Sequence, residues 1–251
     1  MCGRLVVVEP DLSVFVAPYG ANLVVGEPWQ PRYNLAPTQR SPVITSEAAR
    51  RLDLLRFGAV VRWAPSATTG RMLINARVET VATLRSFREA LALRRCIVPV
   101  NGYYEWQVQR ELKRPHYIHN TEGAPIALAG IWQRWATRQG EPQEGFVLIT
   151  RPARGFLSDI HDRMPLTVSP SLIDCWLDPR ERDANDLAPV LTAAPQFEGW
   201  TAHEVAPIVN KPSNDSPECL SPYSAPPSPL DRQLELFASP AGLPHVGPPR
   251  S

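Results

Sequence analysis

The second residue of the chain is a cysteine, directly after the initiator methionine. Removal of Met1 before a small residue is routine, and it would leave Cys2 with a free α-amine beside its thiol. The amine has a pKa of roughly 7.7–8.0 and the thiol one of about 8.5, so both are usable nucleophiles near neutral pH. The amine can attack an aldehyde to give an imine, and the neighbouring sulfur can then close a five-membered thiazolidine ring with an intramolecular advantage. Two alternatives stay open: the thiol alone attacks a carbonyl, as in amidohydrolases with N-terminal nucleophiles, or Cys2 is an inert apolar residue.

Two further residues could move protons in such a reaction. Glu105 follows two tyrosines and precedes a tryptophan, and on a strand it shares a face with Tyr103. Apolar surroundings of this kind raise the pKa of a carboxyl group toward the range that is useful for proton transfer. His161 lies in a segment, 159–165, that we expect to be a loop, where imidazole could act as an acid or a base. The alternatives are a solvated strand carboxylate for Glu105 and a structural, hydrogen-bonded histidine for His161.

The sequence contains no clear metal site or disulfide scaffold. His116 and His119 have a spacing found in some metal sites, but no third ligand lies near them in the sequence. The four cysteines are scattered and form no CxxC pair, which argues against both a zinc ribbon and a disulfide framework; they are Cys2, Cys96, Cys175 and Cys219. We therefore expect chemistry that uses neither a metal nor a cofactor.

Composition limits the class of protein that positions these residues. The chain has 251 residues, 43% of them hydrophobic, which suffices for one large domain or two small ones. No run approaches the roughly 18–20 apolar residues of a membrane span, and the N-terminus lacks a secretory signal, so we expect a cytoplasmic protein. Residues 1–163 hold 21 Lys and Arg against 14 Asp and Glu, whereas residues 164–251 hold 5 against 11. The basic first part could attract a polyanion.

Hydrophobic patterns and turn signals predict many short strands and a few helices. Strands are expected at 5–8, 73–80, 96–100, 103–108, 126–135 and 145–150, with an Asn-Gly turn at 101–102. Helices are expected at 81–93 and 169–177, the second capped by Ser169 and with Pro170 at its first position. These elements predict one α+β domain over residues 2–223, with a mixed, mostly antiparallel β-sheet and flanking helices. Residues 224–251 are rich in proline and serine and are expected to form a disordered tail.

Several ordered segments give the chain a family resemblance. They are Cys2-Gly3-Arg4; Tyr33-Asn34-Leu35-Ala36-Pro37; Asn75-Ala76-Arg77-Val78-Glu79-Thr80; Arg94 to Pro99, running on to Gly102-Tyr103-Tyr104-Glu105-Trp106; Ala129-Gly130-Ile131-Trp132; and His161-Asp162-Arg163-Met164-Pro165. With these segments, over roughly residues 2–220, the chain resembles the SOS response-associated peptidase (SRAP) family of abasic-site processing proteins.

The resemblance implies a protein that binds single-stranded DNA and captures abasic sites, whose sugar equilibrates with an open-chain aldehyde. Cys2 would condense with that aldehyde into a thiazolidine DNA–protein crosslink, after Met1 is removed autocatalytically or by an aminopeptidase. By motif, His161 would promote opening of the sugar ring, and Asn75 would orient the N-terminus and the sugar. Glu105 would shuttle protons and assist the removal of Met1, the basis of the peptidase name. We expect a monomer without a cofactor, associated with the nucleoid at replication forks.

DNA binding should combine phosphate contacts with stacking. The candidates for phosphate contacts are Arg4, Arg77, Arg85 and Arg163; Met164 and Pro165, which follow Arg163 in the same motif, are further candidate DNA contacts. Trp63 falls where the family carries a tryptophan that stacks or wedges between bases. This segment departs from the family pattern, with Phe57 in place of the usual Trp and Val61 in place of the usual Pro. A core position for Trp63 therefore stays open.

The tail contains one apolar island, Gln233-Leu234-Glu235-Leu236-Phe237. It resembles the short motif, beginning with glutamine, through which bacterial proteins bind the sliding clamp. Leu234, Leu236 and Phe237 would enter a hydrophobic pocket, and the flanks would act as a tether. A chance match is the alternative. Two other functions stay open: a cysteine-type peptidase or amidohydrolase that acts on proteins, and a noncatalytic adaptor between DNA and the clamp.

Overall fold

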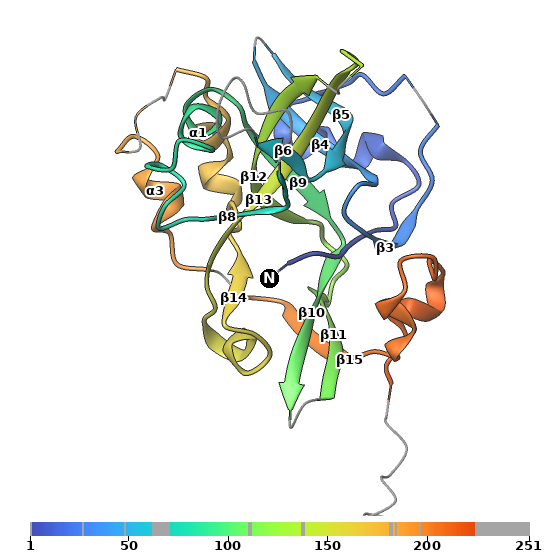
Figure 1. Cartoon of the computed structure of the whole chain (residues 1–251). Coiled ribbons are helices and arrows are strands. Elements are labelled where there is room, and N and C mark those ends of the chain that lie inside the picture. Colours follow the sequence, from blue (N-terminus) through green and yellow to red (C-terminus); the bar gives the residue numbers. More distant parts are fainter. Residues whose placement is uncertain are drawn as a thin grey trace, which may run out of the picture.

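The computed structural model describes residues 2–26, 28–47, 49–61, 71–109, 112–136, 139–180, 183, 185–195 and 197–223, and its strands form two main sheets (Figure 1). The smaller sheet has the strand order β15-β11-β10-β1-β3, with β1 Leu5–Val7, β3 Arg32–Leu35, β10 Gly102–Gln109, β11 Leu112–Asn120 and β15 Trp200–Glu204. The larger sheet has the order β14-β13-β12-β9-β4-β5-β2, with β8 paired to β13. Its strands are β2 Asn22–Leu23, β4 Arg40–Ser46, β5 Arg50–Phe57, β8 Asn75–Arg77, β9 Arg95–Val100, β12 Ile126–Ala136, β13 Pro142–Pro152 and β14 Arg163–Pro165. A separate pair is formed by β6 Ala59–Val61 and β7 Arg71–Leu73.

Helices contribute short segments around these sheets. The α-helices are α1 Arg88–Leu93, α2 Ile173–Leu177 and α3 Ala188–Leu191. The 3₁₀ helices are η1 Leu12–Phe15, η2 Ala17–Tyr19, η3 Gly155–Asp159, η4 Pro170–Leu172, η5 Pro207–Asn210 and η6 Pro217–Leu220. None of the helices in the described ranges is long and apolar enough to cross a membrane.

Most strand pairs are antiparallel, and the exceptions involve three short contacts. Strands β8 and β5 pair parallel to β13, and β2 pairs parallel to β5. The prediction of an α+β fold with a mixed, mostly antiparallel sheet and a few helices is therefore confirmed. The predicted tail, residues 224–251, lies outside the described residues, so the domain boundary at 223 stays a prediction.

The first strand is held inside a sheet, which fixes the position of the N-terminal segment. Strand β1 lies between β10 and β3, and Leu5 is paired with Tyr103 and with Leu35. The pairing continues toward the N-terminus, because the Tyr104 N–H donates to the Arg4 carbonyl at 3.0 Å. Residues that precede a central strand cannot fray freely. This arrangement brings Cys2 alongside the strand that carries Glu105.

The Asn-Gly turn does not join a hairpin. Strand β9 before it belongs to the larger sheet, and β10 after it belongs to the smaller one. Asn101 stabilises the crossing, since its N–H donates to the Val6 carbonyl at 2.8 Å and its Oδ1 accepts from the Val8 N–H at 2.9 Å. Glycine is required next, because a Cβ on Gly102 would lie 2.4 Å from the Ile118 carbonyl oxygen. The turn signal was correct, but the chain uses it to change sheets.

Two predicted helices are shorter than expected. The helix predicted at 81–93 is α-helical only from Arg88 to Leu93, and the preceding residues form successive turns. A β-branched residue with poor helix propensity, Thr83, bonds its hydroxyl back to the Thr80 carbonyl in this stretch. The helix predicted at 169–177 begins as η4 and becomes α-helical only at Ile173. Ser169 precedes it without a side-chain cap, because its hydroxyl contacts that of Ser171 at 3.2 Å.

Candidate active site around Cys2

Cys2 is completely buried, and a side chain from the larger sheet holds its main chain. The Asn75 Nδ2 donates to the Cys2 carbonyl at 3.0 Å. Asn75 begins β8, which is fixed in turn by parallel pairing of Asn75 with Leu148 of β13. The first residues after the initiator methionine are thus positioned by both sheets at once: by β10 through the backbone and by β8 through an amide side chain.

Glu105 lies on β10 with only 3% of its surface exposed, so the alternative of a solvated carboxylate is excluded. Burial raises its pKa from 4.5 to about 7, because desolvation disfavours the charged form. Burial also raises the pKa of the Cys2 thiol well above its ordinary value, and the nearby Glu105 carboxylate acts in the same direction. A carboxyl that is about half protonated near neutral pH can both donate and accept a proton.

His161 lies between η3 and β14, in a loop that is tied to the same strand as Glu105. The Gln107 side-chain amide of β10 donates to the Asp159 carbonyl at 2.7 Å. The charge of Asp162, next to His161, contributes to the raised pKa of Glu105, which places this loop near the carboxylate. Burial lowers the pKa of His161, so its imidazole is neutral at neutral pH.

The Nδ1 atom of His161 has two contacts that require different protonation states. It lies 2.9 Å from the Arg163 backbone N–H, which can only donate and therefore needs a lone pair on Nδ1. It also lies 2.8 Å from the Asp162 carboxylate, whose pairing would require a proton on Nδ1. We favour the first arrangement, since the lowered pKa keeps the ring neutral and Asp162 is largely exposed to water.

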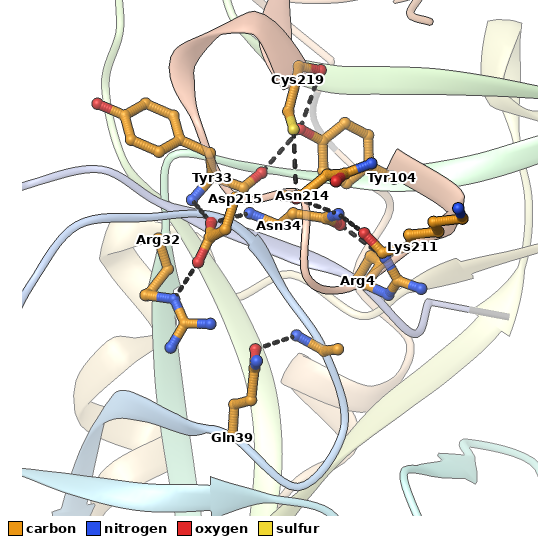
Figure 2. A network of polar contacts seen from close by, with 11 residues as sticks. Arg4, Arg32, Tyr33, Asn34, Gln39, Tyr104, Lys211, Asn214, Asp215 and Cys219 are labelled. Atoms are coloured by element: carbon orange, nitrogen blue, oxygen red, sulfur yellow. Dashed lines mark hydrogen bonds and ion pairs between the residues drawn. The ribbon is translucent and has the colours of Figure 1, made fainter. Parts of the chain in front are cut away.

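The arginines predicted to bind phosphates fall into two groups. Arg77 and Arg85 are exposed, as a phosphate contact requires. Arg163 is 12% exposed and forms a bidentate ion pair with Glu79. Arg4 donates to Asn34 Oδ1 at 2.7 Å (Figure 2) and to the Val209 carbonyl at 2.6 Å.

The environment of Arg4 is a hydrogen-bonded cluster that joins β3 to the last described segment of the chain (Figure 2). The Asp215 carboxylate accepts from the backbone N–H groups of Tyr33 and Asn34, at 2.6 and 2.8 Å, and pairs with Arg32. The guanidinium of Arg4 also lies 5.8 Å from the ring of Trp106. Arg4 is therefore a structural link between β1, β3 and η5, which sequence analysis did not predict.

Two candidate DNA contacts are placed differently from the prediction. Met164 is 1% exposed and belongs to the hydrophobic core, and Pro165 is also buried. Both residues belong to β14, which pairs with β13 in the larger sheet. The direct DNA contact predicted for them stays a prediction, although both side chains are buried here. Trp63 and the island at 233–237 lie outside the described residues, and their roles stay predictions.

Tyr103 and Glu79, which neighbour predicted site residues, were not themselves among the predicted site residues. The hydroxyl of Tyr103 is buried and has no hydrogen-bond partner among the described residues, and it lies near enough to Cys2 and Glu105 to sense their charges. Its position on the face of Glu105 was visible in the alternation of the strand. Glu79 was visible only as part of a motif, because its partner Arg163 is 84 positions away in the sequence.

The two histidines whose spacing resembles that of metal ligands contact different partners on opposite faces of the sheet. His116 and His119 both lie on β11, where residues three apart point to opposite faces of the sheet. His119 stacks on Tyr117 with ring centroids 4.5 Å apart, and His116 Nδ1 lies 3.1 Å from the Arg114 carbonyl. Within the described residues, no group of three or more His, Cys, Asp or Glu is arranged to hold a metal ion.

Fold and site together define a β-rich domain built around an N-terminal cysteine, with a buried carboxylate, an amide and a histidine near it. The profile of the family described as SOS response associated peptidase (SRAP) matches residues 1–212, so the chain belongs to that family. The resemblance found in the ordered motifs is thereby confirmed.

Relatives support the same assignment. The abasic site processing protein YoaM of Bacillus subtilis is 35% identical over 194 residues, which cover 76% of this chain and 85% of YoaM. The abasic site processing protein YedK of Escherichia coli is 31% identical over 230 residues, which cover 88% of this chain and 100% of YedK. A crystal structure of a Bacteroides thetaiotaomicron protein aligns with a TM-score of 0.75 at 25% identity, covering 89% of this chain and 100% of that one.

Proposed function

We propose that this protein processes abasic sites in single-stranded DNA by forming a thiazolidine crosslink between Cys2 and the ring-opened sugar. The observation that carries the proposal is the burial of Glu105 beside Cys2, which gives this carboxyl a pKa of about 7. The names of the relatives, abasic site processing proteins, support the same class of substrate.

The reaction uses the chain's own groups. Once Met1 is removed, the Cys2 amine attacks the aldehyde carbon, and loss of one water leaves an imine. The thiol then adds to the imine carbon: the sulfur–carbon bond forms as the C=N π bond breaks, and a base transfers the thiol proton to the nitrogen. Because burial raises the pKa of the Cys2 thiol, little of it is present as thiolate at neutral pH, and its attack needs such a base. Glu105 can protonate the departing hydroxyl and accept the thiol proton.

His161 acts earlier, on the closed sugar. With Nδ1 accepting from the Arg163 N–H, the ring proton lies on Nε2, where it can donate a hydrogen bond to the ring oxygen as the sugar opens and the C1 hydroxyl proton moves to that oxygen. Asn75 holds the Cys2 carbonyl and so orients the amine that processing creates on the same residue. Arg77 and Arg85 are exposed for phosphate contacts, and they belong to the basic first part of the chain.

The raised pKa of the Cys2 thiol favours this function over a cysteine-type peptidase that acts on other proteins. A peptidase cysteine attacks as a thiolate and has a lowered pKa, whereas burial shifts the pKa of Cys2 upward. Removal of Met1 is a single event on the chain's own N-terminus, which we assign either to the protein, assisted by Glu105, or to an aminopeptidase. A noncatalytic adaptor would need neither Glu105 in its buried position nor the Cys2 thiol.

The test mixes purified protein with single-stranded DNA that carries one abasic site, followed by a denaturing gel. The protein should give a covalent shift, and Cys2→Ala should give none. Cys2→Ser keeps the amine without the thiol, so its imine should appear only after borohydride reduction. Cys175→Ala, which removes a partly exposed cysteine, is the matched control and should shift like the parent protein. A full shift with Cys2→Ala rejects the proposed function.

We also propose that residues 233–237 bind the bacterial sliding clamp. Their pattern of glutamine and three apolar residues within a proline-rich segment supports this partner. Deletion of 233–237 should abolish capture of the protein by immobilised clamp and leave crosslinking intact. Deletion of five tail residues outside the motif, 240–244, is the matched control. Equal capture of the two deletion variants would reject the clamp as the partner of this motif.

A further inference from the structure

We propose that Glu79 is a positioning residue that holds His161 in its working orientation by way of Arg163. The inference rests on the proposed function, in which His161 opens the abasic sugar. Glu79 itself lies away from the reacting atoms, on the segment that follows β8, and it acts on the loop that carries His161.

The first step is the ion pair between Glu79 and Arg163. The two guanidinium nitrogens Nη1 and Nη2 donate to the two carboxylate oxygens at 2.5 and 3.0 Å, which is the bidentate geometry that fixes an arginine most firmly. Nη2 also donates to the Thr150 carbonyl at 2.6 Å. The Arg163 side chain is only 12% exposed, whereas the Glu79 side chain is 44% exposed, so the pair lies at the surface with its guanidinium side buried.

The second step leads from Arg163 to the imidazole. The Arg163 backbone N–H donates to His161 Nδ1 at 2.9 Å, which leaves the ring proton on Nε2. The backbone of Arg163 pairs with Pro152 of β13, and the clamp of its side chain between Glu79 and Thr150 adds a second restraint that keeps this N–H aimed at the ring. The tautomer of His161 is therefore set by a contact that depends on Glu79.

A competing arrangement lies close by. The Asp162 carboxylate is 2.8 Å from the same Nδ1 and would bind it if the ring carried its proton there. Asp162 is 84% exposed and has no bidentate ion pair with any of the residues that the structure describes, so it can take over when the Arg163 N–H moves away. Loss of Glu79 should thus shift the ring proton from Nε2 toward Nδ1, the wrong atom for donation to the sugar.

The ion pair between Glu79 and Arg163 also concerns Cys2, because Glu79 lies close to Asn75 in the sequence. Glu79 is four residues after Asn75, which holds the Cys2 carbonyl, and the Val78 N–H between them donates to the Thr150 carbonyl at 2.8 Å. One short segment therefore holds the nucleophile at one end and the histidine loop at the other. This coupling keeps the amine and the imidazole at a fixed separation.

An alternative role for Glu79 makes an opposite prediction. Its carboxylate could simply occupy Arg163 until a DNA phosphate replaces it. Removal of Glu79 would then increase the affinity for undamaged single-stranded DNA and leave the histidine tautomer unchanged. The two roles can be separated by measuring the tautomer in protein without DNA.

The experiment is ¹⁵N NMR of the His161 side chain in DNA-free protein at pH 8, where the imidazole is neutral. The parent protein should show an unprotonated Nδ1 and a protonated Nε2. Glu79→Gln and Glu79→Ala should shift the two nitrogen resonances toward the other tautomer, and Glu79→Asp, which keeps the charge, should restore the parent pattern in part. Glu89→Gln, which removes the surface pair with Arg94, is the matched control and should leave His161 unchanged.

Crosslinking gives the functional readout. Glu79→Gln should slow crosslinking at saturating DNA on the order of 10-fold, a part of what an acid–base group contributes, without weaker binding of undamaged DNA. The thermal midpoint of each variant shows whether it is folded. A parent tautomer in a folded Glu79→Gln protein overturns the proposal. If the parent protein forms no crosslink at all, the proposed function fails, while the NMR result still decides the role of Glu79.

Discussion

Two clusters of buried polar groups lie beside the first strand, and they differ in how fully their hydrogen bonds are made. In the cluster around Asn34, Oδ1 accepts from Arg4, and Nδ2 lies within 3.1 Å of three backbone carbonyls (Figure 2). In the cluster around Cys2, Asn75 Oδ1 and the Tyr103 hydroxyl are buried with no hydrogen-bond partner among the described residues. The side-chain amide of Asn34 thus has all its hydrogen-bond partners, whereas two buried polar groups beside Cys2 have none among the described residues.

This difference separates stability from function. A buried polar group with all its partners contributes to stability, whereas one without a partner costs about 1–3 kcal/mol. Proteins keep such unpaired groups mainly where a ligand completes them. The cluster around Asn34 holds the last described segment to β3, and the cluster around Cys2 keeps two hydrogen-bonding groups that a ligand could pair.

The largest effect is expected at Glu105. Glu105→Gln removes a carboxyl beside Cys2 that can exchange a proton at neutral pH, so the rate of crosslinking should fall on the order of 10³-fold. Single-turnover crosslinking at pH 7 measures this rate. Glu204→Gln, which alters a carboxylate paired with Arg114 on the same sheet, is the matched control and should react at the parent rate. A Glu105→Gln protein as fast as this control would contradict the role assigned to the carboxyl.

The second prediction compares the two asparagines directly. Asn34→Ala removes the Oδ1 acceptor of Arg4 and the Nδ2 contacts with three backbone carbonyls, so the free energy of unfolding should fall by about 4 kcal/mol. Asn75→Ala removes a single hydrogen bond, to the Cys2 carbonyl, and should cost about 1 kcal/mol. Urea unfolding of the two variants measures both values. Equal losses would break the distinction between a complete and an incomplete cluster.

The third prediction is a dependence of stability on pH that originates from Glu105. Its pKa rises from 4.5 to about 7 on folding. The folded protein thus holds this proton while the unfolded chain releases it. The associated stability is fully present below pH 4.5 and is lost as the pH rises to about 7, a loss of about 3 kcal/mol.

Glu105→Gln should remove this contribution. Urea unfolding between pH 5 and 8 should show the variant gaining stability relative to the parent protein as the pH rises. Since other groups titrate identically in both proteins, the difference isolates Glu105. A constant difference across this range would mean that Glu105 has an ordinary pKa in the folded protein.

Local patterns in the sequence were sufficient for part of this site. The alternation around 103–108 placed Glu105 and Tyr103 on one face, because side chains of a strand alternate regardless of the rest of the fold. The apolar run at 5–8 correctly predicted that the N-terminus is fixed in a sheet. Both signals depend only on neighbours in the chain.

Such local patterns could not predict contacts between segments that are distant in the sequence. Arg4 was predicted to bind phosphate, yet its guanidinium contacts Val209, 205 positions away. Met164 was a candidate DNA contact because of its motif, and only the packing of β14 against β13 shows that it is buried. An arginine or a methionine has the same local signal in either role, so burial and the partner decide between them.

Mass spectrometry of the crosslinked N-terminal peptide tests the central claim most directly. The account predicts a peptide that begins at Cys2, carries the sugar remnant with the loss of one water, and has neither a free amine nor a thiol that can be alkylated. Both nitrogen and sulfur must then be bonded to the sugar carbon. A remnant on another side chain, or on a peptide that still begins with Met1, would contradict the account.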